Sequence, residues 1–361
     1  MKTLLVMAGG TGGHVMPALA VARDLSARGV NIVWMGTAHG SEHELVPAAG
    51  CELRYVHIRG IRRSGLGRKL MAPFVLIGAA LQAAWIIMSC RANAILGMGG
   101  YVSGPGGLVG RLMLKPLILH EQNAVVGTTN SLLAPVATRV LTGFKQVEKL
   151  SGGEYVGNPV RSDIVAVQAP AQRIRRDAKH LKILVVGGSQ GAQVFNENLP
   201  RLLQILQERL GDAVRVSVHH QCGRNNHAEV SQRYAQSGLE VRVEEFIRDM
   251  ARAYQDSELV ICRAGAMTVA EVAAAGAAAL FVPLPHAIDD HQYYNARALS
   301  DHQAAMCFRQ EEFVSGQWLD TVAGLAVDRD ALITMAERAR SASQPDATRR
   351  VADICMEVLD A

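Results

Sequence analysis

The residues of this sequence that could do chemistry lie beside short glycine-rich segments. His14 closes the segment 9–14 (GGTGGH), and an imidazole, with an ordinary pKa near ~6.5, can act as a general base. The segment HEQN contains His120, Glu121 and Asn123 and follows an apolar run. Residues just past the ends of parallel strands line the ligand cleft of α/β proteins. We therefore predict that these three residues line a cleft.

Candidate contacts to a phosphate and a sugar lie in the second half of the chain. The turn around Ser189 (GGSQGA) and the segment 262–268 each lead from an apolar run into a helical pattern. The free N–H groups at a helix start bind anions. Arg161 is expected to reach a phosphate, Glu271 to accept both hydroxyls of a ribose, and Gln292 to hydrogen-bond a sugar. These residues predict a ligand with a pyrophosphate, a ribose and a sugar.

Apolar runs and glycine turns predict the elements that position these side chains. Residues 4–7 and 31–35 are expected to be buried parallel strands with a helix between them, and the pattern restarts at residues 182–186. We predict an α/β protein with two doubly wound domains, joined by the loop-like stretch 157–176. Further strands are expected at residues 94–96, 116–119, 215–219, 240–243, 259–262 and 279–282.

The length of 361 residues, at ~100–200 residues per domain, predicts two domains, or three. We place one in residues 1–160, one in residues 161–345, and in residues 346–361 a helix that packs back on the first domain. Residues 1–160 carry 15 basic and 7 acidic side chains, against 22 and 26 in the rest of the chain. This asymmetry suggests that the first domain meets an anionic partner, a membrane surface or a phosphate-bearing substrate, unless it is chance surface composition.

The composition argues against several classes of protein. The net charge of +4 is too small to indicate a nucleic-acid-binding protein. The six cysteines include no CxxC pair, so neither a disulfide framework nor a zinc site is predicted, and a reducing cytoplasm is expected. The first apolar stretch is too short for a secretory signal. Asp289 and Asp290 suggest the start of a helix rather than a metal site.

The segment 70–90 contains 21 residues without a charge, which is long enough to span a bilayer. Pro73 and Gly78 interrupt it, and the α/β pattern continues on both sides, which argues against a span. Four basic residues precede it: Arg62, Arg63, Arg68 and Lys69. The combination predicts a helix that lies on an anionic membrane surface. An ordinary helix that covers the sheet is the alternative.

Six motifs occur in order along the chain: GGTGGH (9–14), GMGGY (97–101), HEQN (120–123), GNPVR (157–161), GGSQGA (187–192) and RAGAMTVAE (263–271). In this order they resemble the MurG family of bacterial peptidoglycan glycosyltransferases. The resemblance covers essentially the whole chain, and the set is far more specific than any single motif. It implies the GT-B fold, with two Rossmann-like, doubly wound domains whose parallel sheets face an interdomain cleft.

The resemblance implies an enzyme, an inverting hexosyltransferase of peptidoglycan synthesis and therefore of cell shape and division. It would move N-acetylglucosamine from UDP-N-acetylglucosamine to the C4 hydroxyl of the N-acetylmuramoyl(pentapeptide) of lipid I, which is linked to pyrophosphoryl-undecaprenol. Lipid II and UDP would be the products. The implied location is peripheral, on the cytoplasmic face of the inner membrane, and no cofactor or metal is expected. Implied partners are both substrates, an anionic phospholipid surface and cell-wall synthesis proteins.

The resemblance also implies roles for single residues. Ser189 and Arg161 would meet the diphosphate, and Ile247 would present its backbone to uracil. Glu271 would hold the ribose and Gln292 the sugar, although His291 stands where the family often has the first glutamine of a pair. The implied donor contacts are Thr11, Gly12, Gly13, Asn123, Arg161, Ser189, Ile247, Ala266, Met267, Thr268, Val269, Ala270, Glu271 and Gln292.

The expected reaction needs a base and a stabilised leaving group. The acceptor hydroxyl would attack the anomeric carbon from the face opposite UDP, with His14 as the first choice of base and Glu121 as the second. The helix starts at Ser189 and at residues 264–268, with Arg161, would stabilise the leaving diphosphate.

Three other functions fit parts of the sequence. A UDP-N-acetylglucosamine 2-epimerase shares the fold but needs no membrane surface. A nicotinamide oxidoreductase would need a GxGxxG register and an acidic residue after the second strand, and neither is found. A nucleotide-sugar-binding membrane adaptor would be expected to lack polar cleft residues such as His14, Glu121, Asn123 and Gln292.

Overall fold

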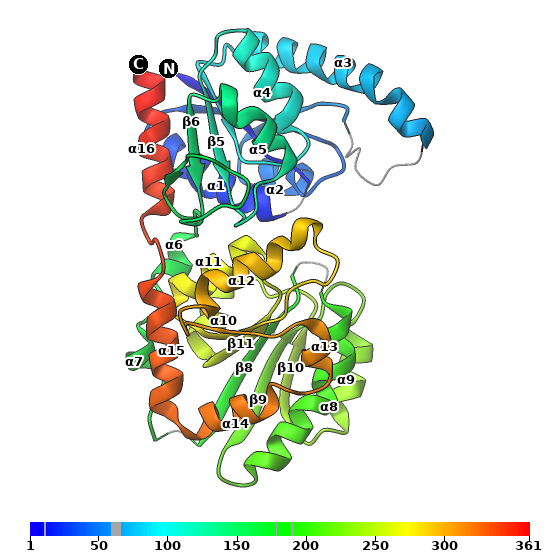
Figure 1. Cartoon of the computed structure of the whole chain (residues 1–361), viewed down its shortest axis with the longest axis vertical. Helices are drawn as coiled ribbons and strands as arrows, with labels where there is room; N and C mark the ends of the chain where they lie inside the picture. The colour runs from blue at the N-terminus through cyan, green and yellow to red at the C-terminus, as the bar shows by residue number, and fades with distance from the viewer. Residues whose placement is uncertain (11, 59–65, 178, 189–190) are drawn as a thin grey trace. The chain divides into compact units, whose positions relative to one another are not determined.

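A computed structural model describes residues 1–10, 12–58, 66–177, 179–188 and 191–361. The chain divides into two compact units. Unit 1 comprises Met1–Arg161 and Asp346–Ala361, and unit 2 comprises Ser162–Pro345. Each unit is built on one sheet with helices packed against it (Figure 1). Four residues singled out in the sequence lie outside the described residues: Thr11, Arg62, Arg63 and Ser189.

Unit 1 contains a sheet of seven strands: β1 (Thr3–Met7), β2 (Asn31–Gly36), β3 (Glu52–Tyr55), β4 (Ala94–Gly97), β5 (Leu117–Glu121), β6 (Arg139–Thr142) and β7 (Glu154–Tyr155). Their order in the sheet is β3-β2-β1-β4-β5-β6-β7, and all neighbouring pairs are parallel. β1 and β4 are buried along their whole length, as expected for strands covered on both faces. The strand order reverses between β1 and β4, which makes this the topological switch point of the sheet.

The helices of unit 1 come from both ends of the chain. They are α1 (Gly12–Ala27), α2 (Glu42–Ala48), α3 (Leu66–Ser89), α4 (Ser103–Leu112), α5 (Thr128–Leu133), the 3₁₀ helix η1 (Ala134–Val136) and α16 (Ala347–Asp360). α16 packs along α1 (Figure 1). Its Val351 and Cys355 are fully buried in one core cluster with Leu4 and Val6 of β1, and Lys2 pairs with Asp360 at 2.8 Å. The last helix is therefore part of the first unit.

Unit 2 repeats the same plan with six strands: β8 (His180–Val186), β9 (Arg215–Gln221), β10 (Glu240–Glu244), β11 (Leu259–Cys262), β12 (Ala278–Phe281) and β13 (Met306–Cys307). The order is β10-β9-β8-β11-β12-β13, again with parallel neighbours. Its switch point lies between β8 and β11. The helical elements are α6 (Ser162–Val165), α7 (Pro170–Arg173), α8 (Gln193–Leu210), α9 (His227–Ala235), α10 (Met250–Asp256), α11 (Ala266–Ala275), η2 (Ile288–Asp290), α12 (His291–Ser300), α13 (Gln310–Val314), α14 (Leu319–Val327) and α15 (Arg329–Ser341).

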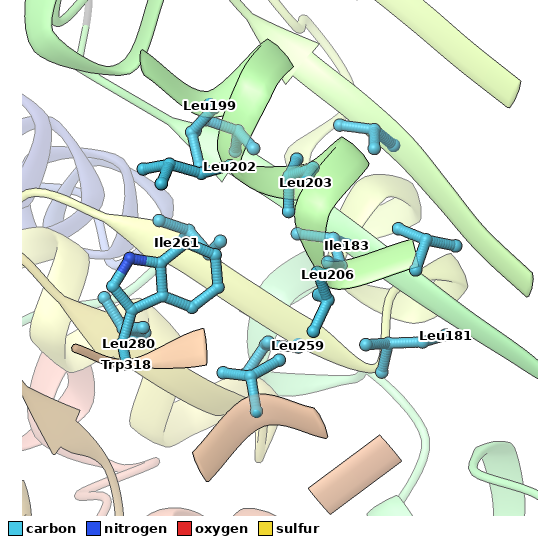
Figure 2. Packing of buried hydrophobic residues seen from close by; sticks show 14 of the residues in the cluster. Leu181, Ile183, Leu199, Leu202, Leu203, Leu206, Leu259, Ile261, Leu280 and Trp318 are labelled. Carbon is cyan, nitrogen blue, oxygen red and sulfur yellow. The ribbon is translucent and has the colours of Figure 1, made fainter. Parts of the chain in front are cut away.

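The core of unit 2 lies between α8 and the sheet (Figure 2). Leu199, Leu203 and Leu206 recur on one face of α8, at the spacing of helix turns, and all three are fully buried. Trp318 is also fully buried, and its indole N–H donates to the carbonyl of Phe313 at 3.0 Å. Burying this ring without a partner for its N–H would destabilise the core.

The predicted pair of doubly wound α/β domains with parallel sheets is confirmed. Three strands extend two residues beyond their predicted bounds: β8 begins at His180, β9 ends at Gln221 and β5 ends at Glu121. β5 continues through His120 and Glu121, which pair with Leu141 and Thr142 of β6, so these two residues lie in the strand and not after it. Their polar side chains suggested a loop, but hydrogen bonds satisfy them inside the fold. The strands that the sequence did not reveal are short and have partly exposed residues: the edge strands β3, β7 and β13, and β6, which lies beside β7.

Candidate functional site

Glycine turns follow the two strands that flank the switch point of unit 1. Gly9 and Gly10 follow β1, and Gly99 and Gly100 follow β4. A Cβ on Gly100, whose φ is +82°, would lie 2.4 Å from the carbonyl oxygen of Gly9. Glycine is therefore required where the two turns touch. Ligands of open α/β sheets bind outside the carboxyl ends of strands at this point.

Glu42, at the start of α2, holds the turn after β1. Its carboxylate is fully buried. It accepts the N–H of Gly10 at 2.9 Å, and the N–H and hydroxyl of Thr37 at 2.9 and 2.8 Å. The turn that leads to His14 is thus fixed by a carboxylate 32 residues away in sequence. Glu42 was not predicted from the sequence, because no local spacing connects it to this turn.

His14 lies half-buried in the first turn of α1. Its Nδ1 is 2.9 Å from Oε1 of Gln122, the residue that follows β5. The ring also packs against Gly99, where a Cβ would come within 2.9 Å of its Cε1 and Nδ1 atoms. The structure therefore brings His14 and the HEQN segment together and holds the imidazole on two sides.

Glu121 organises the loop that follows β5. One carboxylate oxygen accepts the backbone N–H of Asn123 at 3.0 Å and its side-chain amide at 3.3 Å. The other accepts the N–H of Gly127 at 3.0 Å and the side-chain amide of Asn130 at 2.9 Å. Glu121 is 2% exposed. Four hydrogen bonds thus use both oxygens of this buried carboxylate to shape the loop and to orient Asn123.

The remaining unit 1 residues predicted to contact the donor are Gly12, Gly13 and Arg161. Gly12 and Gly13 begin α1, and a Cβ on Gly12 would meet no atom of the described residues within 4 Å. Arg161 is half-buried and is the last residue of the first segment of unit 1. Space beside Gly12 allows close approach of a ligand to the helix start.

The glycine turn after β8 packs on the end of β9. Gly191 has a φ of +74°, and a Cβ there would lie 2.1 Å from the carbonyl oxygen of Cys222. The same oxygen accepts the side-chain amides of Asn196 and Asn226, each at 3.0 Å. The starts of α8 and α9 are thus tied to one carbonyl group, against which Gly191 also packs.

Gln221, the last residue of β9, connects two segments predicted to contact the donor. It is 4% exposed. Its Nε2 donates to the carbonyl of Gly188 at 2.8 Å, and its Oε1 accepts the N–H of Ile247 at 3.0 Å. One side chain therefore joins the phosphate turn to the segment predicted to meet uracil. Gln221 was not predicted from the sequence, because both of its partners are remote in sequence.

The start of α11 offers free backbone donors. Its N-cap, Gly265, is extended with a ψ of 145°, and the first N–H groups of an α-helix have no partner within the helix. These groups belong to Ala266, Met267 and Thr268. The N–H of Val269 already donates to the carbonyl of Gly265 at 3.0 Å, and its side chain is buried. A phosphate at this helix start would meet the first three residues rather than Val269.

Arg263, the residue after β11, hydrogen-bonds to the segment that follows β12 and to the start of α13. Its guanidinium donates to the carbonyls of Val282 and Pro283 at 3.0 and 3.2 Å and to Oε1 of Gln310 at 2.7 Å. Burial lowers the pKa of this guanidinium to about 10. Its hydrogen-bonding capacity is directed to the protein itself, so Arg263 positions the loop that leads into α11.

The predicted ribose and sugar contacts lie on α11 and α12. Ala270 and Glu271 are half-buried on α11, and the hydroxyl of Tyr254 donates to the Glu271 carboxylate at 3.3 Å. Gln292 lies in the first turn of α12, and its Oε1 accepts the N–H of Leu284 at 3.0 Å. Both side chains are therefore oriented by a neighbour.

Asp289 and Asp290 form the 3₁₀ turn η2 directly before α12, and both have positive φ values. The Asp290 carboxylate makes two hydrogen bonds with the Arg309 guanidinium, at 2.8 and 2.7 Å. Among the residues that the structure describes, no group of three or more His, Cys, Asp or Glu side chains is arranged to hold a metal ion.

α3 presents an apolar face to solvent. Ala79, Ala83, Ile86 and Ile87 are buried against the sheet side of unit 1. On the opposite side, five large apolar residues are 58–69% exposed: Phe74, Ile77, Leu81, Trp85 and Met88. Within the described ranges, no helix is long and apolar enough to cross a bilayer. We call these five residues the α3 apolar face.

Two domain models of one enzyme family match this chain. The glycosyltransferase family 28 N-terminal domain matches residues 4–142, and the C-terminal domain of the same family matches residues 182–351. The chain therefore belongs to glycosyltransferase family 28. It is an enzyme that transfers a sugar.

Relatives with names define the group within this family. UDP-N-acetylglucosamine–N-acetylmuramyl-(pentapeptide) pyrophosphoryl-undecaprenol N-acetylglucosamine transferase of Aeromonas hydrophila subsp. hydrophila is 48% identical over 98% of this chain and 96% of its own. The transferase of the same name from Shewanella amazonensis is also 48% identical, over 99% and 98%. The crystal structure of MurG from Acinetobacter baumannii is 38% identical with a TM-score of 0.85, covering 99% of this chain and 100% of that one. The resemblance to the MurG family and the GT-B fold class are confirmed.

Proposed function

We propose that this enzyme transfers N-acetylglucosamine from UDP-N-acetylglucosamine to the C4 hydroxyl of the N-acetylmuramoyl(pentapeptide) of lipid I, with inversion at the anomeric carbon. The products are lipid II and UDP. Near-full-length relatives carry the name of this reaction. The observation that carries the proposal in this chain is His14, held at the switch point of unit 1 by Gln122.

Unit 2 supplies most of the donor contacts in this proposal. The free N–H groups of Ala266, Met267 and Thr268 donate to a phosphate oxygen, with Ser189 and Arg161 as further diphosphate contacts. Glu271 accepts the ribose hydroxyls, as an oriented carboxylate can do. Val269 and Ala270 are the further donor contacts proposed on α11.

The uracil and the sugar have separate contacts. The N–H of Ile247 is used by Gln221, so its carbonyl oxygen is the backbone group that meets uracil. Gln292 hydrogen-bonds the sugar. Thr11, Gly12, Gly13 and Asn123 are the contacts from unit 1 to the donor sugar and the acceptor.

His14 is the base that takes the proton of the attacking hydroxyl. Glu121 is less suited to this role, because its buried carboxylate already accepts four hydrogen bonds from the loop after β5. Negative charge grows on the leaving diphosphate, and prearranged N–H donors at a helix start stabilise such charge without reorganising. The roles are therefore divided, with the base on unit 1 and the leaving-group contacts mainly on unit 2.

The α3 apolar face binds the enzyme peripherally to the membrane that carries lipid I. An undecaprenyl chain keeps the acceptor in the lipid, so the enzyme must work at the surface. Large apolar side chains on one face of an exposed helix suit insertion into the headgroup region. The cytoplasmic face of the inner membrane is the side proposed, as the resemblance to the MurG family implies, and proteins of the cell-wall synthesis complex are proposed partners there.

Labelled UDP-N-acetylglucosamine, incubated with and without a lipid I analogue, tests the function. We expect label in the lipid product only when the acceptor is present. Label in a free epimerised sugar nucleotide would instead identify a 2-epimerase. Tight UDP binding with no turnover would identify a binding adaptor.

A further inference from the structure

A line of hydrogen bonds leads from a backbone carbonyl to the imidazole of His14. Nε2 of His120 lies 2.9 Å from the carbonyl oxygen of Gly157. Nδ1 of His120 lies 3.1 Å from Nε2 of Gln122. Oε1 of Gln122 lies 2.9 Å from Nδ1 of His14. His120 and Gln122 are 0% and 1% exposed, so water does not compete for these bonds.

The Gly157 end fixes the protonation of His120. A carbonyl oxygen can only accept, so Nε2 of His120 must carry the proton that it donates. Burial lowers the pKa of His120 to about 4, so the ring is neutral near pH 7 and its Nδ1 carries a lone pair. That lone pair accepts an N–H from Gln122, which requires the amide nitrogen of Gln122 to face His120.

The backbone of His120 fixes the same amide independently. Nε2 of Gln122 also lies 3.2 Å from the carbonyl oxygen of His120. If the amide were flipped, its oxygen would face that carbonyl oxygen and the Nδ1 lone pair, and no hydrogen bond could form. The oxygen of Gln122 therefore points to His14, and Nδ1 of His14 must be the donor.

We propose that Gln122 is a positioning residue that selects the Nδ1–H tautomer of His14 and so leaves the lone pair on Nε2 as the atom that takes the substrate proton. The identity of that substrate rests on the proposed function above, whereas the tautomer does not. Two further contacts keep the arrangement rigid. The side-chain amide of Asn158 donates to the backbone carbonyl of Gln122 at 2.9 Å, and Gly99 backs the His14 ring.

The chain offers variants that separate these bonds. Gln122→Met keeps the length of the side chain but removes both its donor and its acceptor. Gln122→Glu keeps an acceptor for Nδ1–H of His14 and loses the donor to His120. Gln207→Met is the matched control, since the Gln207 amide also makes three hydrogen bonds, at 2.7–3.1 Å to residues 211–216 in unit 2, and has no part in the line described above.

The tautomer is read directly from the full-length protein. Long-range ¹H–¹⁵N NMR spectra of [¹⁵N]histidine-labelled enzyme report which nitrogen of each ring carries the proton, and His14→Ala identifies the signals of His14. We expect Nδ1–H for His14 and Nε2–H for His120 in the wild type and in Gln207→Met. Gln122→Met is expected to show His14 as a mixture of tautomers, and Gln122→Glu to retain Nδ1–H at His14.

Kinetics with UDP-N-acetylglucosamine and a lipid I analogue complete the test. A wrong tautomer removes the base while leaving the donor contacts, so kcat of Gln122→Met should fall at least about tenfold while KM for the donor stays within about twofold. Gln122→Glu should recover part of kcat. A wild-type His14 protonated on Nε2 would overturn the proposal, even if Gln122→Met failed to fold. An unchanged kcat in a folded Gln122→Met would also overturn it. Nδ1–H at His14 in an enzyme without transferase activity would support the tautomer and reject the proposed function.

Discussion

Burial decides what two of the histidines in this enzyme can do. His120 in unit 1 and His220 in unit 2 are both fully buried, and burial lowers their pKa values to about 4 and about 3. Nδ1 of His220 lies 3.0 Å from the hydroxyl of Tyr234. Neither ring is suited to exchange protons near pH 7. His14, which is half-buried, differs from both in having solvent access.

These two imidazoles make the fold sensitive to acid. In the unfolded chain each takes up a proton near pH ~6.5, but in the folded chain only near pH 4 or 3, so stability is complete above pH ~6.5 and falls as the pH drops through this window. Each histidine should lower the free energy of unfolding by about 1.4 kcal/mol per pH unit there. Urea unfolding between pH 7 and pH 4.5 measures the slope, and His220→Gln should reduce it. An equal slope in that variant would contradict this assignment.

Three residues that organise the candidate site were not predicted from the sequence. Glu42, Gln122 and Gln221 each hydrogen-bond to a segment that a motif did reveal. These hydrogen bonds join residues that are far apart in sequence and meet only in the folded chain. A motif records residues adjacent in the chain, whereas these contacts depend on how strands are placed in a sheet. The sequence therefore revealed the turns and not the side chains that fix them.

Hydrogen bonds connect the turns that follow neighbouring strands of unit 2. Gln221 at the end of β9 bonds to Gly188 after β8 and to Ile247 after β10. The turn predicted to hold phosphate and the segment predicted to hold uracil are thus kept in one arrangement before the donor binds. Such preorganisation lowers the cost of ordering loops upon binding.

Gln221→Leu should therefore weaken donor binding without removing the base. Each of its two hydrogen bonds contributes about 1 kcal/mol, which together corresponds to a rise of at least about tenfold in KM for UDP-N-acetylglucosamine. The KM for the acceptor should stay the same. Gln204→Leu, which breaks an exposed bond to Glu208 on α8, is the control. A donor KM equal to that of the wild type would show that Gln221 does not join these segments.

The α3 apolar face is the exposed side of a helix whose opposite side packs in the core of unit 1. Replacing Leu81 and Trp85, 68% and 62% exposed, with glutamate should reduce binding to anionic vesicles at least tenfold, as burial of one such side chain contributes roughly 1.5–3 kcal/mol. Sedimentation with vesicles measures this. Activity on a water-soluble acceptor should persist. Val327 is an exposed apolar residue on α14, and the control variant Val327→Glu should bind vesicles like the wild type. If the double variant also binds vesicles like the wild type, the α3 apolar face is not the membrane-binding surface.

The main elements were readable from the sequence because buried parallel strands are apolar along their length. β1, β4, β11 and β12 are such strands, and each was expected within a residue or two. β5 was cut short because His120 and Glu121 look like loop residues. The strands β3, β6, β7 and β13 gave no signal, since they are only two to four residues long and most of their residues are exposed or half-buried.

For the whole molecule, the important feature is that the chain returns to its first unit. α16 follows all of unit 2 in sequence but contributes Val351, Cys355 and Leu359 to the core of unit 1. Unit 1 is therefore incomplete without the last residues of the chain, although no motif of the reaction lies in them.

Ile354→Ala tests this dependence. The side chain is 5% exposed in the core of unit 1, and truncating a buried isoleucine costs about 2–5 kcal/mol of unfolding free energy. Glu357 is an exposed residue of the same helix, and Glu357→Ala, which removes its ion pair with Arg139 of β6, should cost less than about 1 kcal/mol. Urea denaturation of both variants checks the difference. Equal effects would mean that α16 is not part of the core.

The proposed reaction transfers N-acetylglucosamine with His14 as its base. The most direct test measures, for the wild type and His14→Ala, the rate of label transfer to a lipid I analogue together with the Kd for UDP. Loss of a general base lowers kcat about 10²–10⁴-fold, and UDP affinity should stay within about twofold because the base does not bind the leaving group. Transfer by His14→Ala at nearly the wild-type rate would contradict the account, as would a loss of UDP affinity large enough to explain the fall in rate.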